Sequence, residues 1–350
     1  MTEKGLLPRE QAILTEIVEY YISHHEAVSA RTLSKFSELS LSPTSIRNLM
    51  KDLSEAGYLT HQGAVRGRLP TRKAFYIYIN SVCGKALRLP AHTPEPPAAD
   101  EGAPALADTL RRIGAHLAEE SGFAAVASLP ARQYYPLDWV RLSSVGATRV
   151  LVSVGTLFGD VWSKVVESPD PFPPQTLADV EAFLNRTYRG RTVEFIRNEI
   201  MSGEPKSLLA DAPSLGAAFR VLRKAFDWGG PPHWLVWGED ALLQVKELHT
   251  PETMLCLHRV LHNSSLIARA AENGRVVEGG LVAIGKAIGF SGLERVVLVA
   301  FPFGWDENHP CMIAVLGPMH MNYQQVVRLV AGGAENLNRV VTSSLSSRTR

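Results

Sequence analysis

The run Ser42-Pro43-Thr44-Ser45-Ile46-Arg47-Asn48, followed about twenty residues later by Gly67-Arg68-Leu69-Pro70-Thr71, decides the fold at the front of this chain. The first run predicts a helix start, because serine is a favoured N-cap residue and proline at the first helical position loses no hydrogen bond. The second run predicts the tip and exit of a basic hairpin. A helix followed by such a hairpin is typical of a winged helix-turn-helix, a small unit that reads DNA.

The segments around these runs complete the helical unit. Apolar residues between Arg9 and Ser23 recur on one side, which predicts a first helix with one buried face. Ser29 is expected to cap a short second helix whose inward residues are Ala30, Leu33 and Phe36. The third helix is expected to run from Pro43 to Gly57, with a buried face formed by Ile46, Met50 and Leu53. Thr71 is expected to cap a fourth helix.

The third helix and the hairpin supply the candidate DNA contacts. The start of such a helix enters the major groove, where arginine pairs with guanine and asparagine with adenine. We therefore predict base contacts from Thr44, Ser45, Arg47, Asn48 and Lys51. Arg72 and Lys73 stand in the first turn of the fourth helix, where cations are disfavoured, so a phosphate would supply the missing anion. The predicted backbone and wing contacts are Ser42, Arg31, Arg66, Gly67, Arg68, Thr71, Arg72 and Lys73.

Charge and composition favour a DNA-binding protein of the cytoplasm. The net charge of the 350 residues is only +1, but the stretch from Ser42 to Asn80 holds six basic residues against two acidic ones. The positive field is therefore concentrated there. Three distant cysteines in apolar surroundings indicate neither a disulfide framework nor a zinc site. The sequence begins with no apolar signal segment and has no run suited to a membrane span, which favours a cytoplasmic location.

Motifs near both ends of the chain resemble one family. They are Ala27-Val28-Ser29-Ala30-Arg31-Thr32-Leu33-Ser34, Leu41-Ser42-Pro43-Thr44-Ser45-Ile46-Arg47-Asn48, Gly67-Arg68-Leu69-Pro70-Thr71 and Val315-Leu316-Gly317-Pro318-Met319-His320-Met321-Asn322-Tyr323. Over almost its whole length the chain resembles the HrcA family of heat-inducible bacterial transcription repressors. The resemblance implies a dimer that binds an inverted-repeat operator of chaperone genes, is released on heat stress, and has a GroEL-type chaperonin as partner. The chain departs from the family pattern at Leu49, Arg72, Met319 and His320.

The rest of the chain predicts a sheet domain behind a linker, which gives an α+β fold class. Five prolines between Leu89 and Ala105 indicate a semi-rigid connector. Beyond it, runs rich in valine and leucine predict strands, and helical stripes at either end predict two flanking helices. The strand runs are Phe123–Ala127, Asp138–Leu142, Arg149–Val154, Asp160–Glu167, His233–Trp237, Val276–Ile284, Glu294–Phe301 and Cys311–Leu316.

This order predicts a mainly antiparallel sheet and resembles the GAF-like sensor fold of the HrcA family. Between about residues 171 and 231 helical stretches replace the strands, and the resemblance assigns such an insertion to dimerisation. A dimer is also favoured by DNA geometry, because two symmetric winged helices read a palindrome. The expected division is 1–82 for the winged-helix DNA-binding domain, 83–104 for the linker, 105–170 and 232–346 for the GAF-like domain, and 171–231 for the insertion.

Catalytic and metal sites have little support in the sequence. His258 and His262 are spaced to share a metal on one helix face, but the adjacent glutamate of a zinc protease is absent. The loop holding Asp306, Glu307 and His309 suits a solvated turn as well as an acid–base pair. The chain has no dinucleotide-binding glycine motif, P-loop or nucleophile elbow, so we expect no enzyme, no cofactor and no metal.

Two alternatives to an operator-binding repressor stay open. A GAF-like sheet can enclose a small-molecule pocket, which would make the protein a ligand-gated winged-helix regulator of other genes. A winged helix can also serve as a protein-interaction module without DNA binding. The basic hairpin argues against this second alternative, because clustered cations are the electrostatic signature of a nucleic-acid partner.

Overall fold

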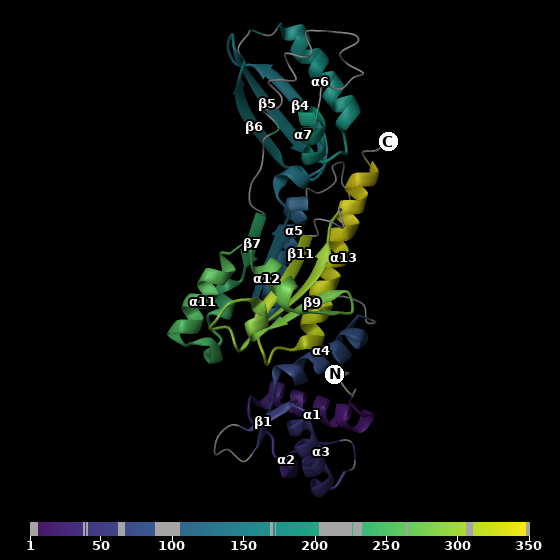
Figure 1. Ribbon diagram of the computed structural model, residues 1–350, viewed down its shortest axis with the longest axis vertical. Helices are drawn as coiled ribbons and strands as arrows, with labels where there is room; N and C mark the ends of the chain where they lie inside the picture. The colour runs from purple at the N-terminus through teal and green to yellow at the C-terminus, as the bar shows by residue number, and fades with distance from the viewer. Residues whose placement is uncertain are drawn as a thin grey trace.

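The computed structural model is a mixed α/β protein with antiparallel sheets, whose lobes follow one another along the longest axis (Figure 1). In that view the lowest lobe holds the N-terminus, the middle lobe the largest sheet and the upper lobe a smaller sheet. None of the described helices combines the length and apolar character that a membrane span needs. The structure describes residues 6–37, 39, 41–61, 67–87, 106–168, 171, 173–202, 226, 233–263, 265–305 and 311–347.

The N-terminal lobe is built from helices and a two-stranded sheet. Its elements are α1 (Pro8–His24), α2 (Ala30–Phe36), α3 (Pro43–Glu55), β1 (Leu59–His61), β2 (Arg68–Pro70) and α4 (Arg72–Ala86). The predicted buried face of α3 is confirmed at Ile46, Met50 and Leu53. The expectation for Phe36 is wrong, because this side chain is 63% exposed. The short helix α2 turns only Leu33 fully inward, and the Phe36 ring instead lies beside Tyr20, with 6.0 Å between ring centroids.

Two predicted helix caps are confirmed and one is wrong. The hydroxyls of Ser29 and Ser42 accept hydrogen bonds from the backbone N–H groups three residues on, at 3.0 and 3.1 Å. Pro43 occupies the first position of α3, and Gly57 beyond its end has a φ of +78°, which suits glycine. Thr71 precedes α4, but its hydroxyl donates to the backbone oxygen of Gly57 at 2.8 Å and does not cap the helix. This bond ties the start of α4 to the end of α3.

A six-stranded antiparallel sheet of order β7-β3-β11-β10-β9-β8 forms the middle lobe. Its strands are β3 (Ala124–Leu129), β7 (His233–Trp237), β8 (Arg275–Val277), β9 (Gly280–Ile284), β10 (Val296–Phe303) and β11 (Cys311–Pro318). As predicted, the first and last helices of the domain, α5 (Leu106–Ser121) and α13 (Tyr323–Ser347), flank it on one face. The opposite face is covered by α11 (Pro251–Leu261) and α12 (Leu266–Asn273) (Figure 1).

Successive side chains along the strands point to opposite faces of the sheet, which produces two cores in the middle lobe. In β10, Val297 and Val299 join the core under α13, whereas Leu298 and Ala300 join the core under α11 and α12. Short helices complete the connections: η1 (Arg132–Tyr134), α10 (Glu239–Leu242), η2 (Lys246–Leu248) and η3 (Gly285–Ile288). A sheet buried on both faces explains why these strands are nearly continuous apolar runs.

The upper lobe corrects the expected grouping of the strands. We expected residues 105–170 to share one GAF-like sheet with residues 232–346, but β4 (Leu137–Ser144), β5 (Arg149–Thr156) and β6 (Val161–Glu167) form a separate antiparallel sheet. This sheet packs on α6 (Pro174–Tyr188) and α7 (Val193–Ser202) around its own core. An apolar strand pattern reports a buried face but not the sheet to which the strand belongs. The inserted unit therefore includes residues 137–167 before the helices.

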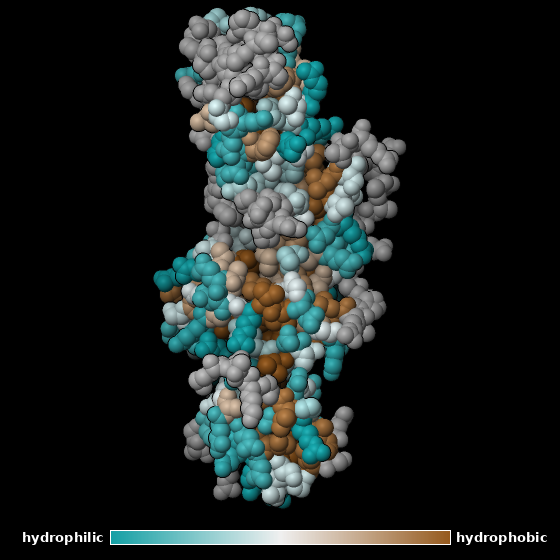
Figure 2. Space-filling view, turned by 45° about the vertical axis from the view of Figure 1, so that its right-hand side comes forward, coloured by the Kyte–Doolittle hydropathy of each residue, from teal (hydrophilic) through white to brown (hydrophobic). Residues whose placement is uncertain are grey.

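Helix α4 joins the lower and middle lobes. It continues to Ala86, beyond the expected boundary at residue 82, and packs on α13. Its buried residues belong to the same apolar cluster as those of α5 and α13, so the two lobes share one continuous core. A broken band of hydrophobic surface runs between these lobes in the space-filling view (Figure 2). The predicted linker from residue 88 onward and the loop at 306–310 lie outside the described residues.

Candidate nucleic-acid interface

Several predicted contact residues line one groove of about 590 Å³ in the N-terminal lobe. They are Arg31, Arg47, Gly67 and Arg68, and the remaining lining residues are Val28, Ser29, Ala30, Met50 and His61. Arg31 belongs to the first turn of α2, Arg47 to α3 and Arg68 to β2. Three separate elements thus each contribute an arginine to the lining of the same hollow. Positive charge gathered in a concave surface attracts a polyanion such as the DNA backbone.

The outer face of α3 is open to solvent. The predicted base-contact residues Thr44, Ser45, Arg47, Asn48 and Lys51 are all exposed. Lys51 Nζ lies 3.7 Å from the Glu55 carboxylate, and an exposed pair of this kind contributes little stability in water. The Ser45 hydroxyl lies 2.9 Å from the Ser42 hydroxyl and takes part in the helix cap. The face therefore offers cationic, amide and hydroxyl groups to a partner outside the molecule.

Arg68 is held in the groove by its own strand. Its backbone N–H and C=O bond to Val28 at 3.0 and 3.1 Å, which fastens β2 to the turn before α2. At Gly67 a Cβ atom would lie 2.9 Å from Ala27 Cβ, so glycine permits this close approach. Burial lowers the pKa of Arg68, although Glu55 raises it, and its buried Nη1 has no hydrogen-bond partner among the described residues.

The two cations at the start of α4 have different surroundings. Arg72 is exposed at the first position of the helix. Lys73 Nζ donates to the backbone oxygen of Ala56 at 3.3 Å and lies 4.3 Å from the centre of the Tyr58 ring. The carbonyl end of α3 and this ring stabilise the ammonium group, so the argument for a missing anion does not apply to Lys73. Arg66 lies outside the described residues.

His61 is a groove residue that sequence reasoning missed. It is exposed at the end of β1 and pairs in register with Arg68 of β2. Its only signal in the sequence was its place in the predicted strand before the basic hairpin. An exposed imidazole beside a guanidinium group adds a further hydrogen-bonding side chain to the groove.

The C-terminal motif lies where the N-terminal and middle lobes meet. Tyr323 is 1% exposed, and its ring packs against Phe75 and Tyr78 of α4, with centroid distances of 6.0 and 6.1 Å. Its hydroxyl donates to the backbone oxygen of Met319 at 2.8 Å. Burial raises the pKa of Tyr78 to about 12 and raises that of Tyr323 well above its ordinary value. Both phenols stay neutral, and the motif couples α13 to the N-terminal lobe.

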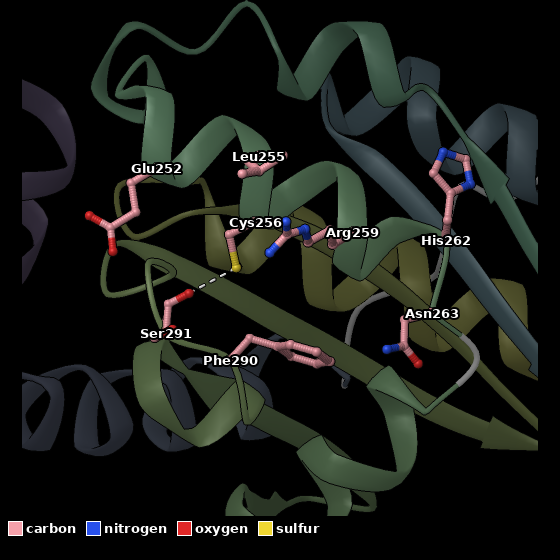
Figure 3. Close-up of a pocket in the computed structure, with 8 residues that line it drawn as sticks. All are labelled: Glu252, Leu255, Cys256, Arg259, His262, Asn263, Phe290 and Ser291. Carbon is pink, nitrogen blue, oxygen red and sulfur yellow. Dashed lines mark hydrogen bonds between the residues drawn. The ribbon is translucent and has the colours of Figure 1, made fainter.

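A hollow of about 680 Å³ lies beside α11 in the middle lobe (Figure 3). Its lining residues are Glu252, Leu255, Cys256, Arg259, His262, Asn263, Phe290 and Ser291. Cys256 Sγ donates to the backbone oxygen of Ser291 at 2.8 Å, and burial raises the pKa of the thiol. A thiol with a raised pKa is a weak nucleophile, so the hollow suits binding better than covalent chemistry. It leaves the ligand-gated alternative open.

Comparisons with known proteins point to the same family as the motifs near the two ends of the chain. The sequence model of the HrcA protein C-terminal domain matches residues 107–327. A heat-inducible transcription repressor HrcA from Laribacter hongkongensis is 28% identical over 349 residues, covering 97% of this chain and 96% of that protein. One of the same description from Methylobacillus flagellatus is 24% identical over 347 residues, covering 96% and 98%.

A solved structure shows the same fold. It is described as a hypothetical protein and has a TM-score of 0.62 and 22% identity, covering 97% of this chain and 100% of that chain. The curated relatives are named as transcription repressors and not as enzymes. The family's sequence model matches most of the chain, and relatives align with it along nearly its full length. The protein therefore belongs to the HrcA family of heat-inducible transcription repressors.

Proposed function

We propose that this protein is a cytoplasmic, sequence-specific repressor of chaperone genes that binds an inverted-repeat operator through a winged helix-turn-helix. The observation that carries the proposal is the groove that Arg31, Arg47 and Arg68 line together. Family membership supports the repressor role. In this assignment α2 and α3 form the helix-turn-helix, and β1 and β2 form the wing.

In the proposed complex, α3 enters the major groove of the operator. Arg47 reads a guanine and Asn48 an adenine, because their side chains can make paired hydrogen bonds to these base edges. Thr44, Ser45 and Lys51 lie on the same face and contact neighbouring bases. The phosphates are bound by the groove and wing residues Arg31, Ser42, Arg66, Gly67, Arg68 and Arg72. Thr71 and Lys73 support the wing from within, since both bond to the end of α3.

Replacing Arg68 with alanine is expected to weaken binding to all DNA sequences similarly and to flatten the slope of log Kd against log salt by about one unit. A phosphate contact releases condensed counterions and carries no base information. Fluorescence anisotropy with an operator duplex and a scrambled duplex, at several salt concentrations, measures both effects. Arg141→Ala, at an exposed arginine of β4, is the matched control. An unchanged salt slope in Arg68→Ala would remove this residue from the interface.

We assign dimerisation to the upper lobe. Apolar side chains exposed there include Val161 and Val165 on β6 and Phe195 and Met201 on α7. Val161 and Val165 share the face of β6 opposite to the buried Val166, and exposed apolar residues that share a face are typical of a protein contact. Pairing through this lobe, with the middle lobe as a GAF-like spacer, would present two N-terminal lobes to the two halves of a palindrome.

We further propose that heat removes the operator-binding form and that a GroEL-type chaperonin restores it. Marginal stability makes a dimer of several lobes sensitive to heating, and a partner that refolds it shifts the equilibrium back. Sedimentation and operator binding are measured before and after a heat challenge, with and without chaperonin and ATP. We expect a dimer that binds before heating, loses binding afterwards and recovers with chaperonin. A monomer at micromolar concentration, or full affinity after heating alone, would contradict the proposal.

A further inference from the structure

Three potential metal ligands from separate segments meet where the N-terminal and middle lobes join. His25 follows α1, Glu247 belongs to η2 and His320 lies between β11 and α13. His25 Nδ1 is 3.0 Å from Glu247 Oε1, and the ring centroids of His25 and His320 are 4.0 Å apart. Each residue offers one ligand atom, and these atoms all lie within 4.8 Å of one another. We name these residues the junction cluster.

The junction cluster has the composition of a transition-metal site. Two imidazoles and one carboxylate form a common ligand set for Zn²⁺, with water in the fourth position. Bonds of about 2.0–2.2 Å in a tetrahedral site separate ligand atoms by about 3.3–3.6 Å. Side-chain rotations that move the ligand atoms by about 1 Å would therefore close the cluster around an ion.

Backbone structure and burial hold the junction cluster in place. His25 has a φ of +60°, in the left-handed region that few residues other than glycine adopt, and its N–H donates to Tyr21 at 2.8 Å. Glu247 and His320 are half-buried, which would partly shield an ion from water. His320 is also one of the positions at which the chain departs from the family pattern.

We propose that His25, Glu247 and His320 bind a divalent transition metal of the zinc class, and that the ion fixes the N-terminal lobe to the middle lobe. α1 and its following turn lead directly into α2 and α3, so a bound ion would hold the candidate DNA interface in one orientation relative to α13. The proposal of metal binding does not depend on DNA recognition. The expected effect of the ion on operator affinity rests on the proposed function.

A second cluster provides an internal control. His258 Nδ1 and His262 Nε2 lie 3.4 and 3.5 Å from the two carboxylate oxygens of Glu239. The two histidine side chains are 66% and 55% exposed. Glu239 lies in α10, His258 in α11 and His262 directly after α11. An ion bound there would link α10 to α11 and leave the junction between lobes unchanged. Sequence reasoning had paired the two histidines but had missed Glu239.

The test is a metal titration of the full-length protein after removal of metals with a chelator. We expect saturating Zn²⁺ to raise the midpoint of thermal unfolding by about 5 °C. This shift should disappear in His320→Asn and Glu247→Gln and persist in the control His262→Asn. Co²⁺, used as a spectroscopic probe, should give a visible d–d absorption band with the wild-type protein. Adding Zn²⁺ should abolish this band by displacing Co²⁺. Metal-free unfolding curves establish that each variant folds.

Three results would overturn the junction site. They are the absence of both the Zn²⁺ shift and the Co²⁺ band in wild type, a shift that persists in folded His320→Asn, and a shift lost only in His262→Asn. Operator binding with and without Zn²⁺ separates this proposal from the previous one. We expect about tenfold tighter binding with the ion, which is a coupling free energy of about 1.4 kcal/mol. If Zn²⁺ stabilises the protein but no duplex binds under either condition, the DNA proposal fails and the metal site stands.

Discussion

Tyr323→Ala is expected to lower the free energy of unfolding by about 3–5 kcal/mol, the usual cost of deleting a fully buried aromatic ring. The ring lies between α13 and the side chains of Phe75 and Tyr78, so its loss opens a cavity in the core shared by two lobes. We expect the N-terminal lobe to separate from the sheet, with an additional unfolding transition at lower temperature. Circular dichroism during heating measures the transitions, and hydrogen exchange in α1 and α4 locates the weakened region.

Tyr323→Phe is the matched control for this prediction. It keeps the ring and removes only the hydroxyl that donates to Met319, so we expect a loss of about 1–2 kcal/mol and a single transition. A loss below about 1 kcal/mol in Tyr323→Ala, with unchanged exchange in α4, would show that the C-terminal motif does not couple the lobes.

Arg47→Ala is expected to reduce operator affinity by about 1–3 kcal/mol, or roughly 5–150-fold, through one base pair of each half-site. The residue is exposed on α3 and makes no contribution to the buried face, so the stability of the protein should change by less than about 0.5 kcal/mol. Affinities for a set of operators, each altered at one base pair, identify the position read by Arg47. The variant should bind all four bases there with similar affinity.

Arg47→Lys separates base reading from charge. Lysine keeps the positive charge but cannot reproduce the paired hydrogen bonds of a guanidinium group, so we expect specificity to fall more than affinity. If Arg47→Ala instead weakens binding equally for every operator while Arg47→Lys restores it, the residue contacts phosphate. That outcome would move base reading to other residues of α3.

Local chemistry made the helix boundaries of the N-terminal lobe predictable. Ser29 and Ser42 cap their helices as expected, because a cap depends on a hydroxyl and a backbone N–H only three residues away. The failures at Phe36 and Thr71 have a different origin. Whether Phe36 is buried depends on what packs over α2, and the Thr71 hydroxyl has a nearby carbonyl only because the end of α3 folds against it.

The candidate interface could be predicted in part. Sequence reasoning selected Arg31, Arg47 and Arg68, and the structure brings all three to one groove. It assigned Lys73 the same role, although the end of α3 already stabilises this ammonium group. The helix-dipole argument considered only the helix to which Lys73 belongs. A neighbouring helix reversed the local electrostatics, and no pattern along α4 contains that information.

By itself the sequence determined most of the helices and strands, the basic face of α3 and the family motifs, since these depend on residues a few positions apart. It took Val276–Ile284 as one strand, whereas the structure divides this run into β8 and β9. The tertiary structure alone decided that β4–β6 leave the main sheet, that Tyr323 joins the lobes and that His25 meets Glu247 and His320. Periodicity reports which side of an element is buried, whereas contacts between distant segments depend on how complete elements pack together. Three-dimensional packing thus created the groove and the junction from parts that the sequence had already specified.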